Sequence, residues 1–289
     1  MAQTVLIVGG GTMGRGIAGV CALAGFDTTV AETDRAARER LVASIEASWK
    51  RAVEAGKLDA AKAHSAAGRL ATVSGPADAP EAAIAIEAVP ESLELKERIF
   101  RELDRLLPKA RFLATNTSSL SIAAIARSTA TPGRVVGVHF FNPVAVMPLV
   151  EVVHGPETLP ETVAAAEEFA ATLGKRTIRV RDAPGFASSR LGIALGLEAM
   201  RMVEEGIASP ADIDRAMELG YGHPMGPLKT SDLVGLDVRL AIAEALAAAL
   251  DPVRFDPPRI LRDLVSQGRT GKKSGRGFYV WEGDRPREE

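Results

Sequence analysis

The chain is poor in several kinds of residue, and each shortage excludes a class of protein. It contains one cysteine, Cys21, among 289 residues. An internal disulfide framework and a cysteine-cluster metal site are therefore excluded, and we expect no metal and a reducing, cytoplasmic setting. Lysine plus arginine number 35 against 37 aspartates plus glutamates, a net charge of −2. No global positive field exists to attract nucleic acid or an acidic membrane surface, so neither is an expected partner.

The chain also lacks the uninterrupted apolar run of roughly 18 residues that a membrane-spanning helix needs. Arg15 interrupts the apolar stretch 12–25, and Glu244 interrupts the apolar stretch 240–250. The opening MAQTVLIVGGG has no basic region and soon breaks into glycine, so it predicts a strand and not an export signal. With 46% hydrophobic and 25% charged residues, the composition is that of a folded globular protein. The length predicts about two domains.

Apolar runs alternate with helical stretches through the first 182 residues, which we assign to one domain. The predicted strands are 4–8, 27–32, 84–88, 112–115, 135–139, 149–153 and 177–180. The predicted helices are 12–25, 92–106, 121–127 and 159–173, with long solvated helices inserted between 34 and about 70. This alternation indicates crossover units and a mainly parallel sheet, that is, an α/β doubly wound fold of Rossmann type.

The pattern changes at Asp182-Ala183-Pro184-Gly185, and we place a second, all-α domain at 183–289. Its predicted helices are 186–205, 210–219, 229–249 and 257–267, followed by a basic loop and the aromatic segment 277–281. Apolar residues of the first helix cover more than one stripe: Leu191, Ile193, Leu195, Leu197, Met200, Met202 and Val203. We expect this helix to be buried on more than one side, by its own domain or by a second subunit.

The clearest binding signal is the glycine motif GGGTMG at 9–14, which follows a strand and opens a helix. In a G-x-G-x-x-G fingerprint, Gly9 makes the turn, Gly11 admits a diphosphate and Gly14 brings helix and strand together, with Thr12 and Met13 beside the cofactor. Glu32 ends the second strand 18 residues beyond Gly14, where an acid accepts ribose hydroxyls and repels a 2′-phosphate. NAD is the expected cofactor. NADP remains an alternative because Arg35 and Arg38 are near, FAD ranks third, and a purely structural turn is the remaining possibility.

A candidate catalytic pair lies in VVGVHFFNPVAVMPLVEVV at 135–153. The prolines between the two apolar runs favour a turn, so the second run can fold back and bring Glu151 to His139. Histidine has the pKa range of a base that takes a hydroxyl proton, and a carboxylate on its far nitrogen fixes the tautomer. A lone histidine at a strand end is also often structural.

A second polar cluster, NTSS at 116–119, follows the strand 112–115 at the carboxyl edge of the predicted sheet. Ligands of open α/β sheets bind at this edge, so Asn116 and Ser118 are candidates to orient a substrate oxygen. The alternative is a helix N-cap provided by Ser119 or Ser121.

Motifs spread over almost the entire chain resemble the L-3-hydroxyacyl-CoA dehydrogenase family, in particular the short bacterial 3-hydroxybutyryl-CoA dehydrogenases. The motifs are GGGTMGRGIA (9–18), PESLELK (90–96), NTSSL (116–120), GVHFFNPVAVMPLVEVV (137–153), DAPGFASSRL (182–191), ADIDRAMELGYGHPMGPLKTSDLVGLD (211–237) and GRTGKKSGRGFY (268–279). The resemblance implies reversible NAD-dependent oxidation of (S)-3-hydroxyacyl-CoA, with 3-hydroxybutyryl-CoA as the expected substrate, as in fatty-acid β-oxidation. It also implies a Rossmann domain with an inserted helical hairpin, and a helical domain that forms a homodimer.

The resemblance assigns roles to individual residues. It implies that His139 is the general base with Glu151 as partner, and that Ser118 and Asn116 lie near the reacting hydroxyl and the nicotinamide. The implied cofactor contacts are Gly9, Gly11, Thr12, Met13, Gly14, Glu32, Glu91, Lys96, Asn116 and Asn142. The acyl-CoA substrate would meet Ser118, Ser189 and the hairpin residues Lys50 and Lys57, although a solvated charged face also explains the two lysines.

One position departs from the family pattern. Ser189 stands where the family usually has asparagine in its GFxxNR motif, so substrate placement near Ser189 is open and a polar acyl chain such as 3-hydroxyadipyl becomes an option. Two other functions remain as alternatives: a dehydrogenase of a free hydroxy acid such as L-gulonate, and a catalytically inactive cofactor-binding relative.

Overall fold

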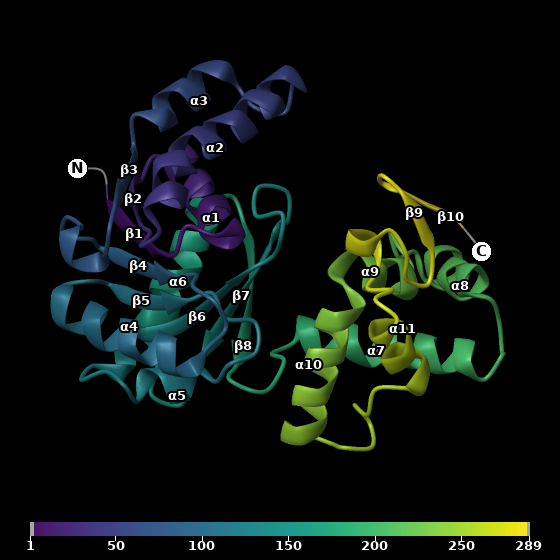
Figure 1. The fold of residues 1–289 in the computed structure, drawn as a ribbon. Helices are drawn as coiled ribbons and strands as arrows, with labels where there is room; N and C mark the ends of the chain where they lie inside the picture. The colour runs from purple at the N-terminus through teal and green to yellow at the C-terminus, as the bar shows by residue number, and fades with distance from the viewer. Residues whose placement is uncertain (1–2, 288–289) are drawn as a thin grey trace. The chain divides into compact units, whose positions relative to one another are not determined.

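The computed structural model describes residues 3–287, and the chain divides into two compact units, Met1–Ala183 and Pro184–Glu289 (Figure 1). Unit 1 is built on an eight-stranded sheet with the order β3-β2-β1-β4-β5-β6-β7-β8. Its strands are β1 (Thr4–Val8), β2 (Asp27–Ala31), β3 (Leu70–Val73), β4 (Ile84–Glu87), β5 (Phe112–Thr115), β6 (Val135–Phe140), β7 (Leu149–His154) and β8 (Arg176–Arg181). All neighbours are parallel except β6 and β7. The predicted mainly parallel α/β sheet is confirmed.

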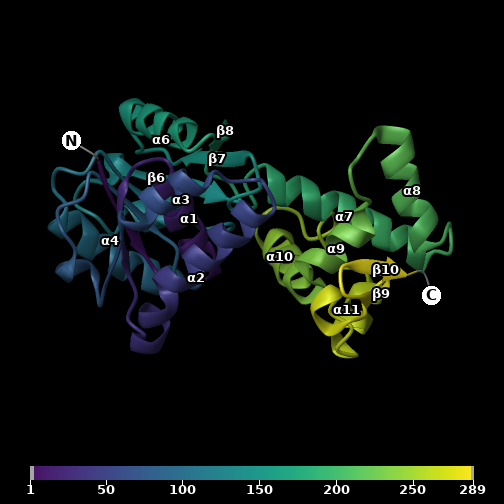
Figure 2. The same cartoon turned by 90° about the horizontal axis from the view of Figure 1, so that it is seen from above.

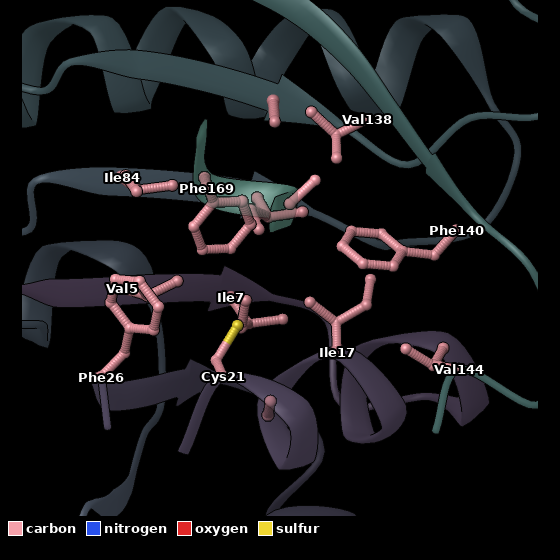
Figure 3. Packing of buried hydrophobic residues seen from close by; sticks show 14 of the residues in the cluster. Val5, Ile7, Ile17, Cys21, Phe26, Ile84, Val138, Phe140, Val144 and Phe169 are labelled. Carbon is pink, nitrogen blue, oxygen red and sulfur yellow. The ribbon is translucent and has the colours of Figure 1, made fainter. Parts of the chain in front are cut away.

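Helices cover the sheet of unit 1 on both sides. They are α1 (Thr12–Leu23), α2 (Arg35–Glu54), α3 (Ala60–Ala67), α4 (Leu93–Leu106), α5 (Ile122–Ala126) and α6 (Pro160–Thr172). On the face shown in Figure 3, Ile17 of α1 and Phe169 of α6 meet the strand residues Ile7 and Val138. The ring of Phe169 lies 5.9 Å from that of Phe112 at an edge-to-face angle of 66°. Central strands that are apolar on both faces therefore fix the sheet between helix layers.

The segment between β2 and β4 differs from the sequence prediction. Asp34 and Asp59 cap α2 and α3 by accepting hydrogen bonds from Ala37 N and Lys62 N. The chain then forms β3, which pairs with β2 directly after the helices expected up to about residue 70; this strand was not predicted. The prediction missed this strand because it is a four-residue edge strand, only partly buried and without a clear apolar alternation.

Unit 2 is helical apart from a hairpin at its end. Its elements are α7 (Ser188–Glu204), α8 (Pro210–Tyr221), α9 (Pro227–Val234), α10 (Leu236–Ala249), α11 (Arg259–Ser266), β9 (Val280–Glu282) and β10 (Arg285–Arg287). The single helix predicted at 229–249 is wrong, because Gly235 has φ of +104° and separates α9 from α10. In Figure 2, α7, α9 and α10 lie side by side.

Helix α7 is buried on one side within the chain. Ile193, Leu197 and Met200 belong to the core of unit 2, whereas Leu191 is 71% exposed and Leu195 is 37% exposed. We expected α7 to be buried on more than one side, and within the single chain it is not. Over residues 3–287, no helix has both the length and the apolar character needed to cross a bilayer.

Candidate active site

The turn from β1 into α1 has the geometry that its glycines predict. Gly9 has φ of +102°, a conformation that favours glycine. A Cβ on Gly14 would lie 1.8 Å from the carbonyl oxygen of Gly9, so strand and helix approach too closely for any side chain. Gly11 precedes α1 without a capping side chain, and the direction of its absent Cβ is open space. The first N–H groups of α1 therefore face a region that an anion can approach.

This turn forms one wall of a cavity of about 670 Å³ in unit 1. Its lining includes residues 8–13, with Thr12 and Met13, together with Glu32 and the segment 88–90. The Glu32 carboxylate accepts hydrogen bonds from Gly10 N at 2.8 Å and Asp34 N at 2.9 Å, which orient it. These features fit the diphosphate and adenosine ribose of a dinucleotide.

The two nearby arginines that raised the NADP alternative are already engaged. Arg38 donates to the carbonyl oxygen of Glu32 at 2.6 Å, and Arg35 pairs with Glu39 at 2.7 Å. Neither is needed to complete the site, and the Glu32 carboxylate would repel a 2′-phosphate. The arrangement favours NAD.

A buried ion pair joins the last residue of β4 to α4. Lys96 Nζ is 2.6 Å from Glu87 Oε1, and the two side chains are 1% and 0% exposed. Glu87 also accepts hydrogen bonds from Thr115 Oγ1 and Val89 N, each at 2.7 Å. Sequence reasoning missed Glu87; the only signal was an acid within the otherwise apolar run IAIEA.

Glu91 links this ion pair to the polar cluster that follows β5. It lies 3.3 Å from Lys96 Nζ and accepts from Ser118 N at 3.2 Å and from the hydroxyls of Thr117 and Ser119. Burial raises the pKa of the Glu91 carboxyl, but the hydrogen bonds and the charge of Lys96 outweigh burial and lower it overall. Glu91 is therefore an ionised anchor for the loop that carries Ser118.

Asn116 joins the cluster to β6. Its Oδ1 accepts a hydrogen bond from Phe140 N at 2.9 Å, which fixes the amide beside the end of the strand that carries His139. Of the two serines considered as N-caps, Ser121 caps α5 by accepting from Ala124 N, whereas the Ser119 hydroxyl donates to Glu91. The structure thus places Glu91, Lys96, Asn116 and Ser118 together at the carboxyl edge of the sheet.

The predicted meeting of His139 and Glu151 is confirmed. Strand β7 folds back antiparallel to β6 and sets His139 opposite Glu151. The His139 Nδ1 to Glu151 Oε2 distance is 2.7 Å, with His139 7% and Glu151 0% exposed. The ring of Phe141 lies 4.5 Å from the imidazole, centroid to centroid. Paired in this way, the imidazole carries its proton on Nδ1, and Nε2 is the basic nitrogen.

The remaining candidate residues belong to other segments of the chain. Asn142 is exposed in the loop between β6 and β7. Lys50 on α2 and Lys57 between α2 and α3 are exposed, and Lys50 lines a separate groove of about 470 Å³ with Trp49 and His64. Ser189 is partly buried in the first turn of α7, in unit 2.

A glycine turn, an acid for ribose and a histidine–carboxylate pair, all on one doubly wound sheet, define a dinucleotide-dependent dehydrogenase. Comparisons with known proteins identify the family within this class. Residues 4–183 match the 3-hydroxyacyl-CoA dehydrogenase NAD binding domain, and residues 185–281 match the C-terminal domain of the same family. The chain belongs to the 3-hydroxyacyl-CoA dehydrogenase family, and the expected cofactor, NAD, is confirmed.

Individual relatives are similar over nearly their whole length. A 3-hydroxybutyryl-CoA dehydrogenase of Mycobacterium tuberculosis is 45% identical, with 96% of this chain and 98% of the relative covered. The crystal structure of (S)-3-hydroxybutyryl-CoA dehydrogenase PaaH1 from Ralstonia eutropha has a TM-score of 0.93 at 39% identity, covering 98% of this chain and 100% of the other. A 3-hydroxyadipyl-CoA dehydrogenase of Escherichia coli is 41% identical over 98% of this chain and 60% of its own length.

Proposed function

We propose that this protein catalyses the reversible NAD-dependent oxidation of (S)-3-hydroxyacyl-CoA to 3-oxoacyl-CoA. The reaction converts the C3 alcohol and NAD⁺ into a ketone, NADH and a proton. The observation that carries the proposal is the 2.7 Å contact between His139 and Glu151 in a chain of this family. Names of the relatives favour a short acyl chain such as 3-hydroxybutyryl.

His139 is the general base in this proposal. When bound, NAD supplies the acceptor for the hydride that leaves C3. Nε2 of His139 takes the proton of the C3 hydroxyl, and the Glu151 carboxylate on Nδ1 stabilises the imidazolium that forms. In the reverse direction the same imidazolium returns the proton to the ketone oxygen.

The surrounding polar residues position the reactants. Ser118 and Asn116 orient the substrate oxygen and the nicotinamide, while Glu91, Lys96 and Asn142 contribute to the cofactor site. Gly9, Gly11 and Gly14 hold the diphosphate, and Glu32 accepts the adenosine ribose hydroxyls. Lys50 and Lys57 face the CoA, and Ser189 contacts the acyl part of the substrate.

We also propose that the protein acts as a cytoplasmic homodimer in β-oxidation. Leu191 and Leu195 support a subunit contact through α7, because both leucines are exposed in the single chain. Sedimentation equilibrium of the wild type and of a Leu191→Glu variant tests this: we expect a dimer that the charge weakens. A monomeric wild type at micromolar concentration would contradict it.

The test of the activity is His139→Gln, assayed as NADH oxidation with acetoacetyl-CoA. We expect kcat to fall roughly 10²- to 10⁴-fold, the usual contribution of a general base. The dissociation constant for NADH, measured by fluorescence titration, should change less than about threefold, because His139 is assigned to proton transfer and not to cofactor binding. His154→Gln, at the far end of β7, is the matched control. Unchanged turnover in His139→Gln would reject the assignment.

A further inference from the structure

The loop between β6 and β7 is held by a lysine from a later segment of unit 1. Lys175 lies between α6 and β8, and its Nζ donates hydrogen bonds to the carbonyl oxygens of Val144 at 2.5 Å and Met147 at 2.9 Å. The next residue, Arg176, donates its N–H to Pro148 O at 2.7 Å, which places Lys175 beside the loop. Burial lowers the pKa of the Lys175 ammonium, so its charge is kept at this position at a cost. A partly buried lysine is thus committed to the backbone of one loop.

The same loop packs against α1 through Val144. The Val144 side chain is 3% exposed and belongs to the same buried cluster as Ile17 of α1 (Figure 3). A Cβ on Gly16 of α1 would lie 2.8 Å from Val144 Cγ2 and 2.9 Å from Val144 Cβ. Gly16 therefore leaves the room that Val144 occupies, and a larger residue there would require the loop to shift. The loop has two anchors, the Lys175 hydrogen bonds and the packing of Val144 on Gly16.

The loop contacts the two places that the cofactor must span. It begins directly after β6, and the ring of Phe141 lies 4.5 Å from that of His139, centroid to centroid. Through Val144 it reaches α1, whose first N–H groups face the site of the diphosphate. The nicotinamide must lie between the diphosphate and the base, because hydride and proton leave neighbouring atoms of the substrate and the reacting groups must be close. The loop is therefore placed along the nicotinamide half of NAD.

We propose that Lys175 is a positioning residue for the cofactor, which holds the β6–β7 loop against α1 in the conformation that binds the nicotinamide half of NAD. Asn142, which we assign to the cofactor site, lies in this loop. The inference rests on the proposed function in one respect, the assignment of His139 as the base beside the nicotinamide. Cofactor affinity depends on Lys175, whereas the catalytic pair does not, because the pairing of β6 with β7 sets His139 opposite Glu151.

The first experiment measures the dissociation constant for NADH in Lys175→Met by fluorescence titration. Methionine keeps the length of the side chain but donates no hydrogen bond. We expect the constant to rise roughly 10-fold, the lower end of the range for hydrogen bonds to a charged group. KM for NADH rises in parallel, while kcat with acetoacetyl-CoA at saturating NADH stays within about threefold of wild type. A dissociation constant within threefold of wild type would overturn the proposal, as would a fall in kcat larger than the rise in the constant.

The matched control is Lys109→Met, because Lys109 is a surface lysine of the same unit, 3.5 Å from Glu81. Its dissociation constant for NADH should equal that of wild type. Thermal unfolding of each variant without cofactor separates folding from binding. A lysine with a purely structural role would lower the melting temperature and leave the NADH affinity of the folded protein unchanged, and this result for Lys175→Met would overturn the proposal.

The second experiment keeps Lys175 and moves the loop from its other anchor. Gly16→Ala puts a methyl group where Val144 lies, so the loop must shift, and the dissociation constant for NADH should rise roughly 10-fold, in line with the usual cost of overpacking. Adding Val144→Ala makes room for the methyl group and should return the constant to within about threefold of wild type. Equal constants in the single and the double variant would overturn the proposal, because Gly16 would then affect the cofactor turn directly.

Failure of the underlying function gives a different result. A wild type that binds NADH but does not oxidise it with acetoacetyl-CoA rejects the dehydrogenase assignment, while the NADH titrations still decide whether the loop is anchored for the cofactor. Wild-type turnover together with unchanged NADH affinity in Lys175→Met and in Gly16→Ala rejects the positioning role alone.

Discussion

The first unit buries each of two carboxylates beside a basic side chain, whereas the second buries charged side chains among neutral donors or with an unpaired donor. In unit 1, Lys96 lies 2.6 Å from Glu87, and His139 lies 2.7 Å from Glu151. In unit 2, Asp232 accepts hydrogen bonds from Phe278 N, Tyr279 N and Trp281 Nε1, each within 3.0 Å. Arg239 has an Nε without a partner among residues 3–287.

The difference follows from what each charge does. The pairs of unit 1 hold side chains in place at the carboxyl edge of the sheet, where the cofactor binds. Each carboxylate has its hydrogen-bond partner within the unit. Asp232 uses its carboxylate to fix the closing segment 277–281 onto α9, a structural task. The Nε of Arg239 takes part in neither arrangement among residues 3–287. The comparison therefore separates buried charged groups whose polar atoms have partners from one that is buried with a donor left unpaired.

The largest predicted effect comes from breaking the buried pair of unit 1. Lys96→Met leaves the Glu87 carboxylate buried without its counter-charge, so we expect a loss of about 3–5 kcal/mol in the free energy of unfolding. Urea denaturation followed by circular dichroism measures it. The double variant Glu87→Gln with Lys96→Met should recover much of the loss, because no charge is then stranded. Equal losses in the single and double variants would show that the pair does not behave as a unit.

An intermediate effect is expected in unit 2 from Asp232→Asn. The amide keeps one acceptor oxygen and turns an NH₂ group toward N–H donors, so buried donors of the closing segment lose their partner at a cost of about 1–3 kcal/mol. Emission of Trp281, read in a Trp49→Phe background, reports unfolding of this segment. Asp263→Asn on the exposed side of α11 is the control and should have little effect. A melting curve of Asp232→Asn that matches this control would contradict the structural role.

The parts of the fold that the sequence predicted are those with strong local signals. Gly9, Gly11 and Gly14 are spaced as a dinucleotide turn requires, and the apolar runs around His139 and Glu151 are long enough to predict two paired strands. Because β7 runs back antiparallel to β6, the pairing of the two strands is enough to bring His139 and Glu151 together. Local pattern was sufficient because each feature depends on residues close in sequence.

The missed features depend on contacts between distant segments. The edge strand β3 is stabilised by pairing with β2, and the break at Gly235 depends on a backbone conformation that an isolated helical pattern does not reveal. Glu87 resembles a solvated strand end until Lys96 of α4 is placed against it. Arg239 resembles an exposed helix residue in the sequence, and only the packing of the folded chain shows that it is 8% exposed.

The smallest predicted stability effect is the one that tests the comparison most directly. Arg239→Met replaces a buried guanidinium by an apolar side chain of similar length, so the cost of burying the charge disappears and little packing is lost. We expect the free energy of unfolding to stay constant or to rise, by no more than about 2 kcal/mol, in contrast to the large loss in Lys96→Met. Urea denaturation of both variants under identical conditions measures the contrast. A loss above 2 kcal/mol in Arg239→Met would mean that Arg239 supports the fold, as Lys96 does, and would contradict the comparison.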